Sequence, residues 1–411
     1  MNTVNRQLFQ QTLRIYALRV PPQKTTQILK SLKGKLIDSN IASRIRSVQQ
    51  DETTGKKLIL LHTNLIDKDA SEVRTEFDSI LSLPDVELIQ HDLHLDYSNF
   101  TTDQVLKRIL PSHLSEKGVP SAFEVIGHIA HVNLRPEYDE YKHQIAQVIM
   151  DKNPALKTVV NKTGKIENEF RVFPMEFLAG EETLETQLKE SNCVFKFDFG
   201  QVYWNSRLQM EHDRLVGKFS SQDVICDVFA GVGPFAVPAA KNKGCVVYAN
   251  DLNPRSFNYL VSNATQNKVQ NLVHTYNLDG REFLRKMFTS EVGQKITRIV
   301  MNLPALAVEF LDVFRNLFDK DSLPKKAPIV HCYGFSSDPD PKSDIVKQAE
   351  KFLGCEIEPT EVHIVRDVSP SKEMLCLSFP LPLSRLMTST DTPSQTSCGA
   401  DEPASKKAKN E

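Results

Sequence analysis

A short run near the middle of the chain constrains the fold more than any other feature. Residues 224–233 (VICDVFAGVG) form an apolar stretch that ends in a turn containing Gly231 and Gly233. Glycines at such a turn let the backbone approach a ligand closely and leave N–H groups pointing outward. With Ala236 they fit the G-x-G-x-x-A dinucleotide fingerprint. Asp251, at the end of the next predicted strand, is placed to accept hydrogen bonds from ribose hydroxyls.

Strands and helices alternate from about residue 200 onward, which is typical of a parallel, doubly wound α/β sheet. The predicted strands are 223–235, 245–254, 296–304, 327–336 and 373–381, and a helix is expected at 254–268. This region is therefore predicted to be a Rossmann-like nucleotide-binding domain.

Two carboxylates indicate which adenosine ligand this domain binds. Asp227 precedes the first glycine, where it would repel a pyrophosphate but could bind the ammonium group of a methionine moiety, directly or through water. Asp279, in the NLDG segment 277–280, could accept a hydrogen bond from an adenine amino group. The pair favours S-adenosyl-L-methionine over NAD as cofactor.

The remainder of the chain divides into smaller parts. We expect α/β domains at 1–105 and 106–200, the nucleotide-binding domain at 201–386 and a disordered tail at 387–411. Strands are predicted at 13–21, 55–63 and 122–134, and helices at 65–84 and 137–153. Segment 110–121 reads as a hinge.

Charge is distributed unevenly along the 411 residues, although the net charge is only −2. The first 37 residues hold seven basic residues and no acid, which leaves 43 basic and 52 acidic residues elsewhere. That start suits either a mitochondrial presequence or a basic edge of the first domain. The lysines of 152–165 could follow phosphates or form a solvated face.

Other signals are weak or absent. Lys406, Lys407 and Lys409 could form a nuclear signal, so mitochondrial matrix, nucleus and cytoplasm all remain expected locations. No apolar run approaches the ~20 residues that span a bilayer, and we expect no membrane segment. The scattered cysteines lack metal-ligand spacing, so no metal site is expected.

Several motifs together resemble the tRNA (guanine-37-N1)-methyltransferases of eukaryotes and archaea, a branch of the class I methyltransferases. The motifs are DVFAGVGPF (227–235), NDLNP (250–254), NLDG (277–280), MNLPA (301–305), IGHIAHVNLR (126–135), KTVVNKTGKIENEFR (157–171), VYWNSRLQMEHDRL (202–215) and RDVSPSKEMLCLSFPLP (366–382). The resemblance covers roughly residues 10–385 and is weakest in the first hundred.

The resemblance implies a fold, a reaction and a partner. A first domain would touch the outer corner of the tRNA, and a middle domain would enclose the anticodon-loop guanine together with the class I domain. The methyl group of S-adenosylmethionine would move to ring nitrogen 1 of guanosine 37, which supports reading-frame maintenance. A monomer is expected.

The chemistry at ring nitrogen 1 requires a base for its proton and a donor for the charge that accumulates at O6. The resemblance assigns the base to Glu211, the O6 contact to Arg171, and an orienting amide to Asn302. Without the resemblance, Glu211 reads as an exposed helix residue paired with Arg207 or Arg214, Arg171 as a surface ion pair, and Asn302 as a strand-end cap.

The resemblance also extends the list of binding residues. Expected cofactor contacts are His212, Asp227, Gly231, Gly233, Asp251, Leu252, Asp279, Gly280 and Asn302, and expected RNA contacts are Arg171, Tyr203 and Arg207. Trp204 could stack on RNA or belong to the core.

Three other functions remain open at this stage. An aminocarboxypropyl transferase acting on the same tRNA position shares the fold and cofactor, and a non-catalytic tRNA-binding protein or an NAD-linked dehydrogenase is less well supported. Exocyclic-amine methyltransferases carry an aromatic residue in N-P-P-Y, whereas residues 302–305 read N-L-P-A here, which fits a ring-nitrogen target.

Overall fold

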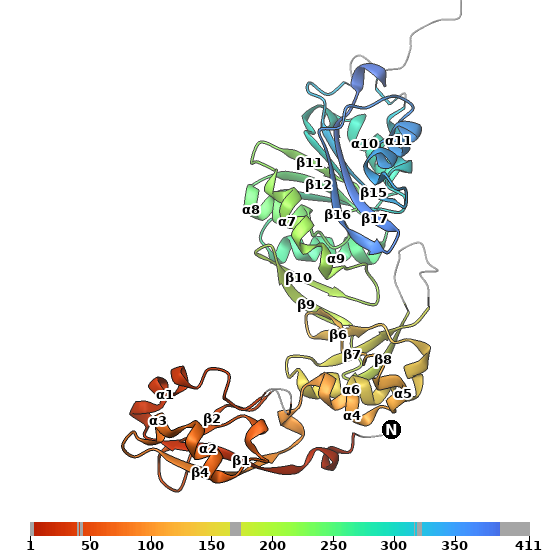
Figure 1. Ribbon diagram of the computed structural model, residues 1–411. Helices are drawn as coiled ribbons and strands as arrows, with labels where there is room; N and C mark the ends of the chain where they lie inside the picture. Colours follow the sequence, from red (N-terminus) through yellow and green to blue (C-terminus); the bar gives the residue numbers. More distant parts are fainter. Residues whose placement is uncertain are drawn as a thin grey trace, which may run out of the picture. The chain divides into compact units, whose positions relative to one another are not determined.

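The computed structural model describes residues 4–38, 41, 44–164, 174–315, 317–318 and 323–386 (Figure 1). The chain divides into two compact units, Met1–Met210 and Glu211–Glu411. Arg171 and the tail from residue 387 lie outside the described residues. The finer division at residues 105 and 200 stays a prediction.

The first unit begins with an antiparallel sheet in the order β2-β3-β1-β4. Its elements are β1 (Gln11–Val20), α1 (Thr25–Ser31), β2 (Val48–Gln50), β3 (Lys57–Leu60), α2 (Ala70–Glu76), α3 (Asp78–Leu81) and β4 (Glu87–Leu95). The predicted strands at 13–21 and 55–63 are confirmed, and β1 lies between β3 and β4 in the sheet. The basic start of the chain therefore supplies a central strand.

The helix expected at 65–84 is wrong as a single element. The chain leaves helical geometry at Phe77, with φ −113° and ψ 16°, between α2 and α3. The Phe77 ring is buried in the core together with Leu18 and Val73. Packing of this ring overrides the helical spacing of the neighbouring apolar residues.

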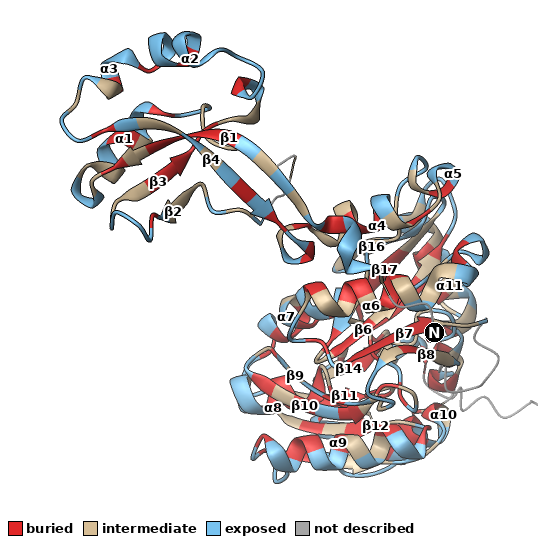
Figure 2. Ribbon diagram, turned by 90° about the horizontal axis from the view of Figure 1, so that it is seen from below, coloured by how far each residue is buried: buried red, intermediate tan, exposed pale blue. Residues whose placement is uncertain are grey.

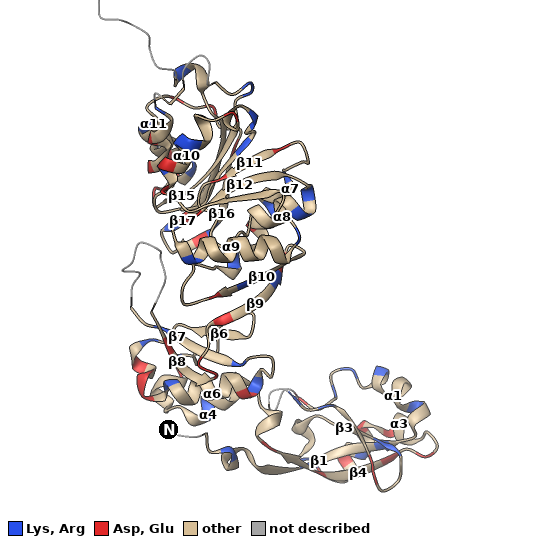
Figure 3. Cartoon of the chain, turned by 180° about the vertical axis from the view of Figure 1, so that it is seen from behind, with Lys and Arg blue, Asp and Glu red and all other residues tan. Residues whose placement is uncertain are grey.

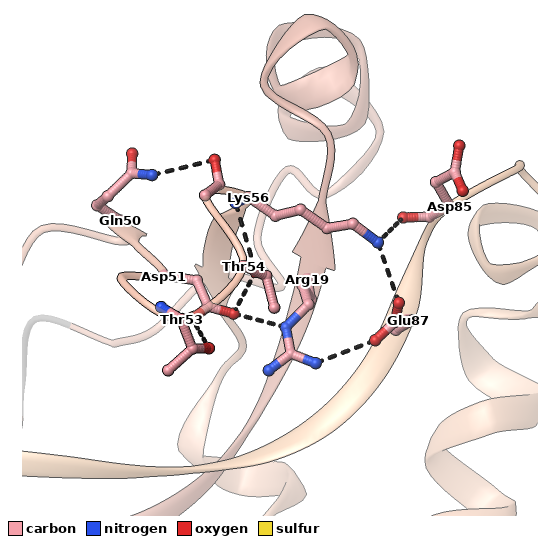
Figure 4. Close-up of polar contacts among 9 residues, drawn as sticks. Arg19, Gln50, Asp51, Thr53, Thr54, Lys56, Asp85 and Glu87 are labelled. Carbon is pink, nitrogen blue, oxygen red and sulfur yellow. Dashed lines mark hydrogen bonds and ion pairs between the residues drawn. The ribbon is translucent and has the colours of Figure 1, made fainter.

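A charged network ties three parts of this sheet together (Figure 4). Arg19 on β1 donates to Asp51 in the β2–β3 turn over 2.6 Å and to Glu87 on β4 over 3.0 Å. Lys56 also donates to Glu87, over 3.0 Å. Hydrogen bonds from Thr53 and Thr54, followed by that from Arg19, hold the pKa of Asp51 well below its usual value.

Acids from later segments neutralise much of the basic start of the chain. Besides Arg19, Arg6 pairs with Asp151 and Lys35 with Glu76, at 2.8 and 3.3 Å. Acids from later segments therefore lie beside several of these cations in the fold. Figure 3 shows segments of both charge signs in the part of the chain that holds β1, β3 and β4.

A second sheet of the first unit has the order β5-β6-β7-β8, followed by the hairpin β9-β10. The elements are α4 (Thr102–Ile109), α5 (Ser112–Ser115), β5 (Glu124–Ile126), β6 (Ile129–Val132), α6 (Lys142–Lys152), β7 (Thr158–Lys162), β8 (Met175–Gly180), β9 (Glu185–Glu190) and β10 (Cys193–Asp198). Helix α6, close to the prediction, connects the parallel pair β6 and β7.

The single strand predicted at 122–134 is two strands, β5 and β6, joined by a tight turn. Gly127 in that turn has φ +61°, which favours glycine, and a Cβ atom there would lie 2.1 Å from Thr186 Oγ1. The apolar alternation continues across the turn, so periodicity alone does not reveal it.

Lys152 is buried rather than available to phosphates. It donates to the Tyr97 carbonyl oxygen, and its Nζ lies 3.8 Å from the centroid of the Tyr97 ring. Burial lowers the pKa of Lys152 to about 8. Lys152 therefore neither contacts phosphates nor belongs to a solvated face, the two roles considered for the lysines of 152–165.

The second unit is a seven-stranded sheet in the order β13-β12-β11-β14-β15-β17-β16. Its elements are α7 (Gln209–Gly217), β11 (Val224–Asp227), α8 (Ala236–Lys243), β12 (Val246–Asn250), α9 (Pro254–Gln266), β13 (Val273–Tyr276), α10 (Gly280–Phe288), β14 (Arg298–Met301), β15 (Ile329–Ser336), α11 (Pro341–Leu353), β16 (Glu361–Ser369) and β17 (Lys372–Pro380). Short 3₁₀ helices complete both units: η1 (Arg6–Phe9), η2 (Pro22–Lys24), η3 (Thr63–Leu65), η4 (Tyr97–Asn99), η5 (Pro136–Tyr141), η6 (Ser206–Leu208), η7 (Gly293–Lys295), η8 (Glu309–Phe314) and η9 (Leu383–Arg385).

This sheet confirms the Rossmann-like prediction and corrects one part of it. Strands β11 to β15 pair in parallel, and they are largely buried (Figure 2). Strand β17 is antiparallel to both β15 and β16, so the sheet is not wholly parallel. The sheet order reverses between β11 and β14, where open α/β sheets bind ligands at the carboxyl ends of their strands.

Within the described part of the chain, no helix combines the length and apolar character needed to cross a bilayer.

Candidate active site

The glycine turn follows β11 and precedes α8. Gly231 and Gly233 have φ of +56° and +100°, so both occupy the left-handed region that favours glycine. A Cβ atom on Gly231 would meet open space, whereas one on Gly233 would lie 2.8 Å from the side chains of Val237 and Leu260. Gly231 thus leaves room beside the turn, and Gly233 allows α8 and α9 to approach it.

Asp227, the last residue of β11, is a buried carboxylate without a hydrogen-bond partner among the described residues. Burial, followed by the charge of Asp251, raises its pKa to about 8, and the nearby Phe229 N–H offsets this only in part. An unpaired buried carboxylate is costly, so a cation placed here would bind favourably. The site therefore fits the ammonium group of S-adenosylmethionine.

Asp251 holds the glycine turn in place. Its Oδ2 accepts a hydrogen bond from Gly231 N–H over 2.8 Å, and its Oδ1 accepts one from Asn253 N–H over 3.0 Å. Burial raises the pKa of Asp251 to about 6, against the lowering effect of these hydrogen bonds. The ribose contact predicted for Asp251 would be made by a carboxylate that already shapes the loop.

We expect Asp251→Ala to weaken binding of S-adenosylhomocysteine. Loss of hydrogen bonds to a charged group costs ~1.5–3 kcal/mol, or roughly 10- to 150-fold in affinity. Isothermal titration of the purified variant measures this, with Glu291→Ala, an exposed carboxylate in the same unit, as the matched control. Wild-type affinity in Asp251→Ala would show that the residue neither binds the ribose nor shapes a binding loop.

The predicted adenine side is built from the ends of β12 and β13. Asp279 is exposed and caps α10, since its Oδ1 accepts from Arg281 N–H over 2.9 Å. Leu252 is 41% exposed, as a ligand-stacking side chain would be. A Cβ atom on Gly280 would lie 2.9 Å from Phe229 and Phe310, so this glycine permits close packing beneath the loop.

Two asparagines that sequence reasoning missed organise this edge of the sheet. Asn250 is buried, donates to the carbonyl oxygens of Val228 and Leu278, and accepts from Leu278 N–H over 2.9 Å. Asn277 donates to the carbonyl oxygen of Asp251 over 2.7 Å. For Asn250 the available signal was a polar residue that closes a buried strand directly before an acid; Asn277 carried no comparable signal.

Glu211 on α7 is buried, which corrects the expectation of an exposed helix residue. Arg214 binds it with two hydrogen bonds, from Nε to Oε2 and from Nη2 to Oε1, each 2.6 Å long. Tyr333 on β15 donates to Oε1 over 2.7 Å. Of the two ion pairs considered from the sequence, the one with Arg214 is present, inside the fold.

The Arg214 guanidinium continues this network outward. Burial acts to lower the pKa of Arg214, but the hydrogen bond and charge of Glu211 outweigh it and raise the pKa above its usual value. Arg214 Nη1 also lies 3.3 Å from Glu361 on β16, and Glu361 pairs in turn with Lys218. The Glu211 carboxylate is therefore fixed in orientation.

His212 and Asn302 lie in the same unit as Glu211. His212 is buried with its ring edge-on to Phe235, at 4.8 Å between centroids. Asn302 follows β14, and its buried Oδ1 has no partner among the described residues. Like Asp227, it is a buried polar group whose position suits a ligand.

The predicted RNA contacts that can be located belong to the first unit. Tyr203 is 45% exposed, and Arg207, whose Nε lies 4.0 Å from Glu124 Oε1, is also exposed. Trp204 is buried and stacked on Phe197 at 5.0 Å, so it is a core residue. Arg171 lies outside the described residues.

The sheet order, the glycine turn after β11 and the acid after β12 define a class I methyltransferase, a Rossmann-like enzyme dependent on S-adenosylmethionine. A family model described as the TRM5/TYW2 methyltransferase domain matches residues 186–362, and one described as the TYW2 N-terminal domain matches 102–183.

Similar proteins identify the family within this class. The chain is 44% identical over 391 residues to the tRNA (guanine(37)-N(1))-methyltransferase of Phytophthora infestans, covering 93% of this chain and 92% of that one. It is 40% identical to the human protein of that name, covering 94% and 77%. The chain belongs to the tRNA (guanine(37)-N(1))-methyltransferase family, as its motifs suggested.

Solved structures agree with this assignment. Trm5b from Pyrococcus abyssi superposes with a TM-score of 0.65 at 25% identity, covering 89% of this chain and 99% of that one. A structure described as the complex of aTrm5 and tRNALeu gives a TM-score of 0.68 at 25% identity, with the same coverage.

Proposed function

We propose that this chain transfers the methyl group of S-adenosylmethionine to ring nitrogen 1 of guanosine at position 37 of tRNA, next to the anticodon. Relatives that carry this activity in their names match more than nine-tenths of the chain at 40–44% identity. That match carries the proposal, and the orphaned Asp227 carboxylate supports the cofactor.

The cofactor, when bound, supplies an electrophilic methyl group on a sulfonium centre. Asp227 would hold its ammonium group, Asp251 the ribose and Asp279 the adenine amino group. His212, Leu252 and the backbone at Gly231, Gly233 and Gly280 would form the remaining wall.

Glu211 would accept the proton from ring nitrogen 1, so that the lone pair of this nitrogen can attack. Arg171 would stabilise the charge that accumulates at O6, and Asn302 would orient the base with its amide. Tyr203 and Arg207 would hold the RNA by stacking and by phosphate contact. Since Arg214 and Tyr333 already occupy the Glu211 carboxylate, proton transfer must use a remaining lone pair or replace one of these contacts.

The aminocarboxypropyl transferase that acts on the same tRNA position is the second candidate. It shares the fold and the cofactor, and the matching domain is described jointly for TRM5 and TYW2. Mass analysis of tRNA after reaction with the cofactor separates the two. A single methyl increment supports the proposal, and a much larger increment would replace it with the second candidate. Stabilisation by NADH but not by S-adenosylhomocysteine in a melting experiment would refute both.

A monomer and the cellular location are further proposals. Among the described residues, the exposed large apolar side chains belong to several different elements, and light scattering tests the proposed monomer. For location we propose mitochondrial matrix, nucleus and cytoplasm. Because β1 is a central strand, removal of a presequence extending past residue 10 would disrupt the first sheet, and imaging of the full chain tagged at its C-terminus tests the distribution.

A further inference from the structure

Methylation of ring nitrogen 1 releases one proton, and that proton has to leave the protein after each turnover. If Glu211 accepts it, the proton resides on a side chain that is only 4% exposed. A buried carboxylic acid without an outlet would block the next cycle. This inference rests on the proposed function and concerns the route by which the proton leaves.

His363 on β16 lies between Glu211 and solvent. Its Nε2 is 3.5 Å from Glu211 Oε2, and its side chain is 36% exposed. Strand β16 forms the edge of the sheet, so this histidine contacts the buried carboxylate from the outer rim of the unit. Oε2 already accepts from Arg214 Nε, and the 3.5 Å separation from His363 Nε2 is a few tenths of an ångström longer than a hydrogen bond, so proton transfer requires the two groups to approach.

The other groups around Glu211 are poor proton carriers at neutral pH. Burial, and then the charges of Cys376 and Glu211, raise the pKa of Tyr333 well above its usual value, and the hydrogen bond with Glu211 outweighs burial to raise that of Arg214. Cys376 on β17 is the register partner of His363 on β16. Burial raises the pKa of the Cys376 thiol to about 12. Glu361, two residues before His363, is an anion paired with Arg214 and Lys218.

Imidazole differs from these groups because histidine both accepts and releases protons near neutral pH. We propose that His363 is a relay residue that carries the ring-nitrogen proton from Glu211 to solvent. The carbon–nitrogen bond forms as the methyl carbon–sulfur bond breaks, which leaves S-adenosylhomocysteine; the N1–H bond breaks, and its proton binds a Glu211 oxygen. It then passes from Oε2 to His363 Nε2, and the imidazolium releases it to water. One proton enters and one leaves, and no other reactant is required.

The test measures multiple-turnover methylation of a tRNA transcript by His363→Ala, with cofactor and RNA saturating and in excess over the enzyme, because the relay acts after the chemical step. We expect a rate at least 10-fold below wild type. Loss of a positioned proton-transfer group costs ~10²-fold or more. Water that replaces the lost side chain would recover part of that factor. Added imidazole should restore the rate in a saturable way. Across substituted imidazoles, the rescued rate should follow their basicity.

Two further variants make the result specific. His274→Ala removes an exposed histidine on β13 that stacks on Tyr248, away from Glu211, and should retain wild-type rate without a response to imidazole. In Glu211→Gln/His363→Ala, imidazole should restore nothing, because no proton reaches the relay position.

The outcomes separate the two proposals. Wild-type enzyme that fails to methylate G37 would overturn the proposed function and the relay together. Active wild type with an unimpaired His363→Ala, or with a slow His363→Ala that imidazole leaves slow, would overturn the relay alone. A melting temperature and an S-adenosylhomocysteine affinity equal to wild type identify the slow variant as correctly folded.

Discussion

Replacement of Glu211 by glutamine is expected to slow methyl transfer by ~10²–10⁴-fold, the usual contribution of a positioned general base. Glutamine keeps the size of the side chain and one acceptor for Tyr333, but it cannot take the proton from ring nitrogen 1. Single-turnover rates at several pH values measure the effect. Full activity across that range would remove Glu211 as the base.

The same substitution leaves the partly buried Arg214 guanidinium with Glu361 as its remaining anionic partner, which costs stability. The rate is therefore compared at a temperature where the variant is folded, and its affinity for S-adenosylhomocysteine should stay within about 3-fold of wild type, less than the loss of one net hydrogen bond of ~1 kcal/mol. Asp213→Asn removes an exposed charge from the same helix and serves as the matched control.

Replacement of Asp227 by asparagine is expected to weaken cofactor binding by roughly 10- to 150-fold, from ~1.5–3 kcal/mol for a hydrogen bond to a charged group. In the free wild type the pKa of Asp227 is about 8, so a cationic ligand must displace a proton at neutral pH. Wild-type affinity should therefore rise with pH and level off above pH ~8, whereas Asp227→Asn should lose this dependence. Titrations in buffers of different ionisation enthalpy measure the released proton.

The stability of the ligand-free protein should change with pH in the opposite direction to its affinity for the cofactor. The folded pKa of Asp227, about 8, lies above its ordinary value of 3.8, so the folded state binds the proton more tightly and the ligand-free protein loses stability as pH rises between these values. Ligand-free Asp227→Asn should accordingly melt above wild type at pH 8 and show a smaller shift with S-adenosylhomocysteine. A lower melting point with unchanged affinity would contradict the ammonium assignment; Glu291→Gln is the control.

The nucleotide-binding half could be predicted because its signals are local. An apolar strand followed by glycines at 231 and 233 requires a turn with positive φ, and an acid after the next strand follows from the same topology. Strand β16 carried no such signal, since its burial pattern is irregular and its pairing with β17 contains two register shifts.

The surroundings of the candidate base could not be predicted in the same way. Arg214 is three residues from Glu211, and helical spacing suggested the pair. Tyr333 and His363 reach the carboxylate from strands more than 100 residues away, and only the folded sheet brings them together. The burial that turns an ordinary helix pair into a fixed carboxylate is likewise a tertiary effect.

The central claim is tested most directly with two tRNA transcripts that differ only in bearing G or A at position 37. The wild-type chain is incubated with each and with S-adenosylmethionine, and the nucleosides are then analysed by mass spectrometry. We predict 1-methylguanosine from the G transcript and no methylated nucleoside from the A transcript. Equal methylation of both, or a methyl group at another position of the guanine, would contradict the account.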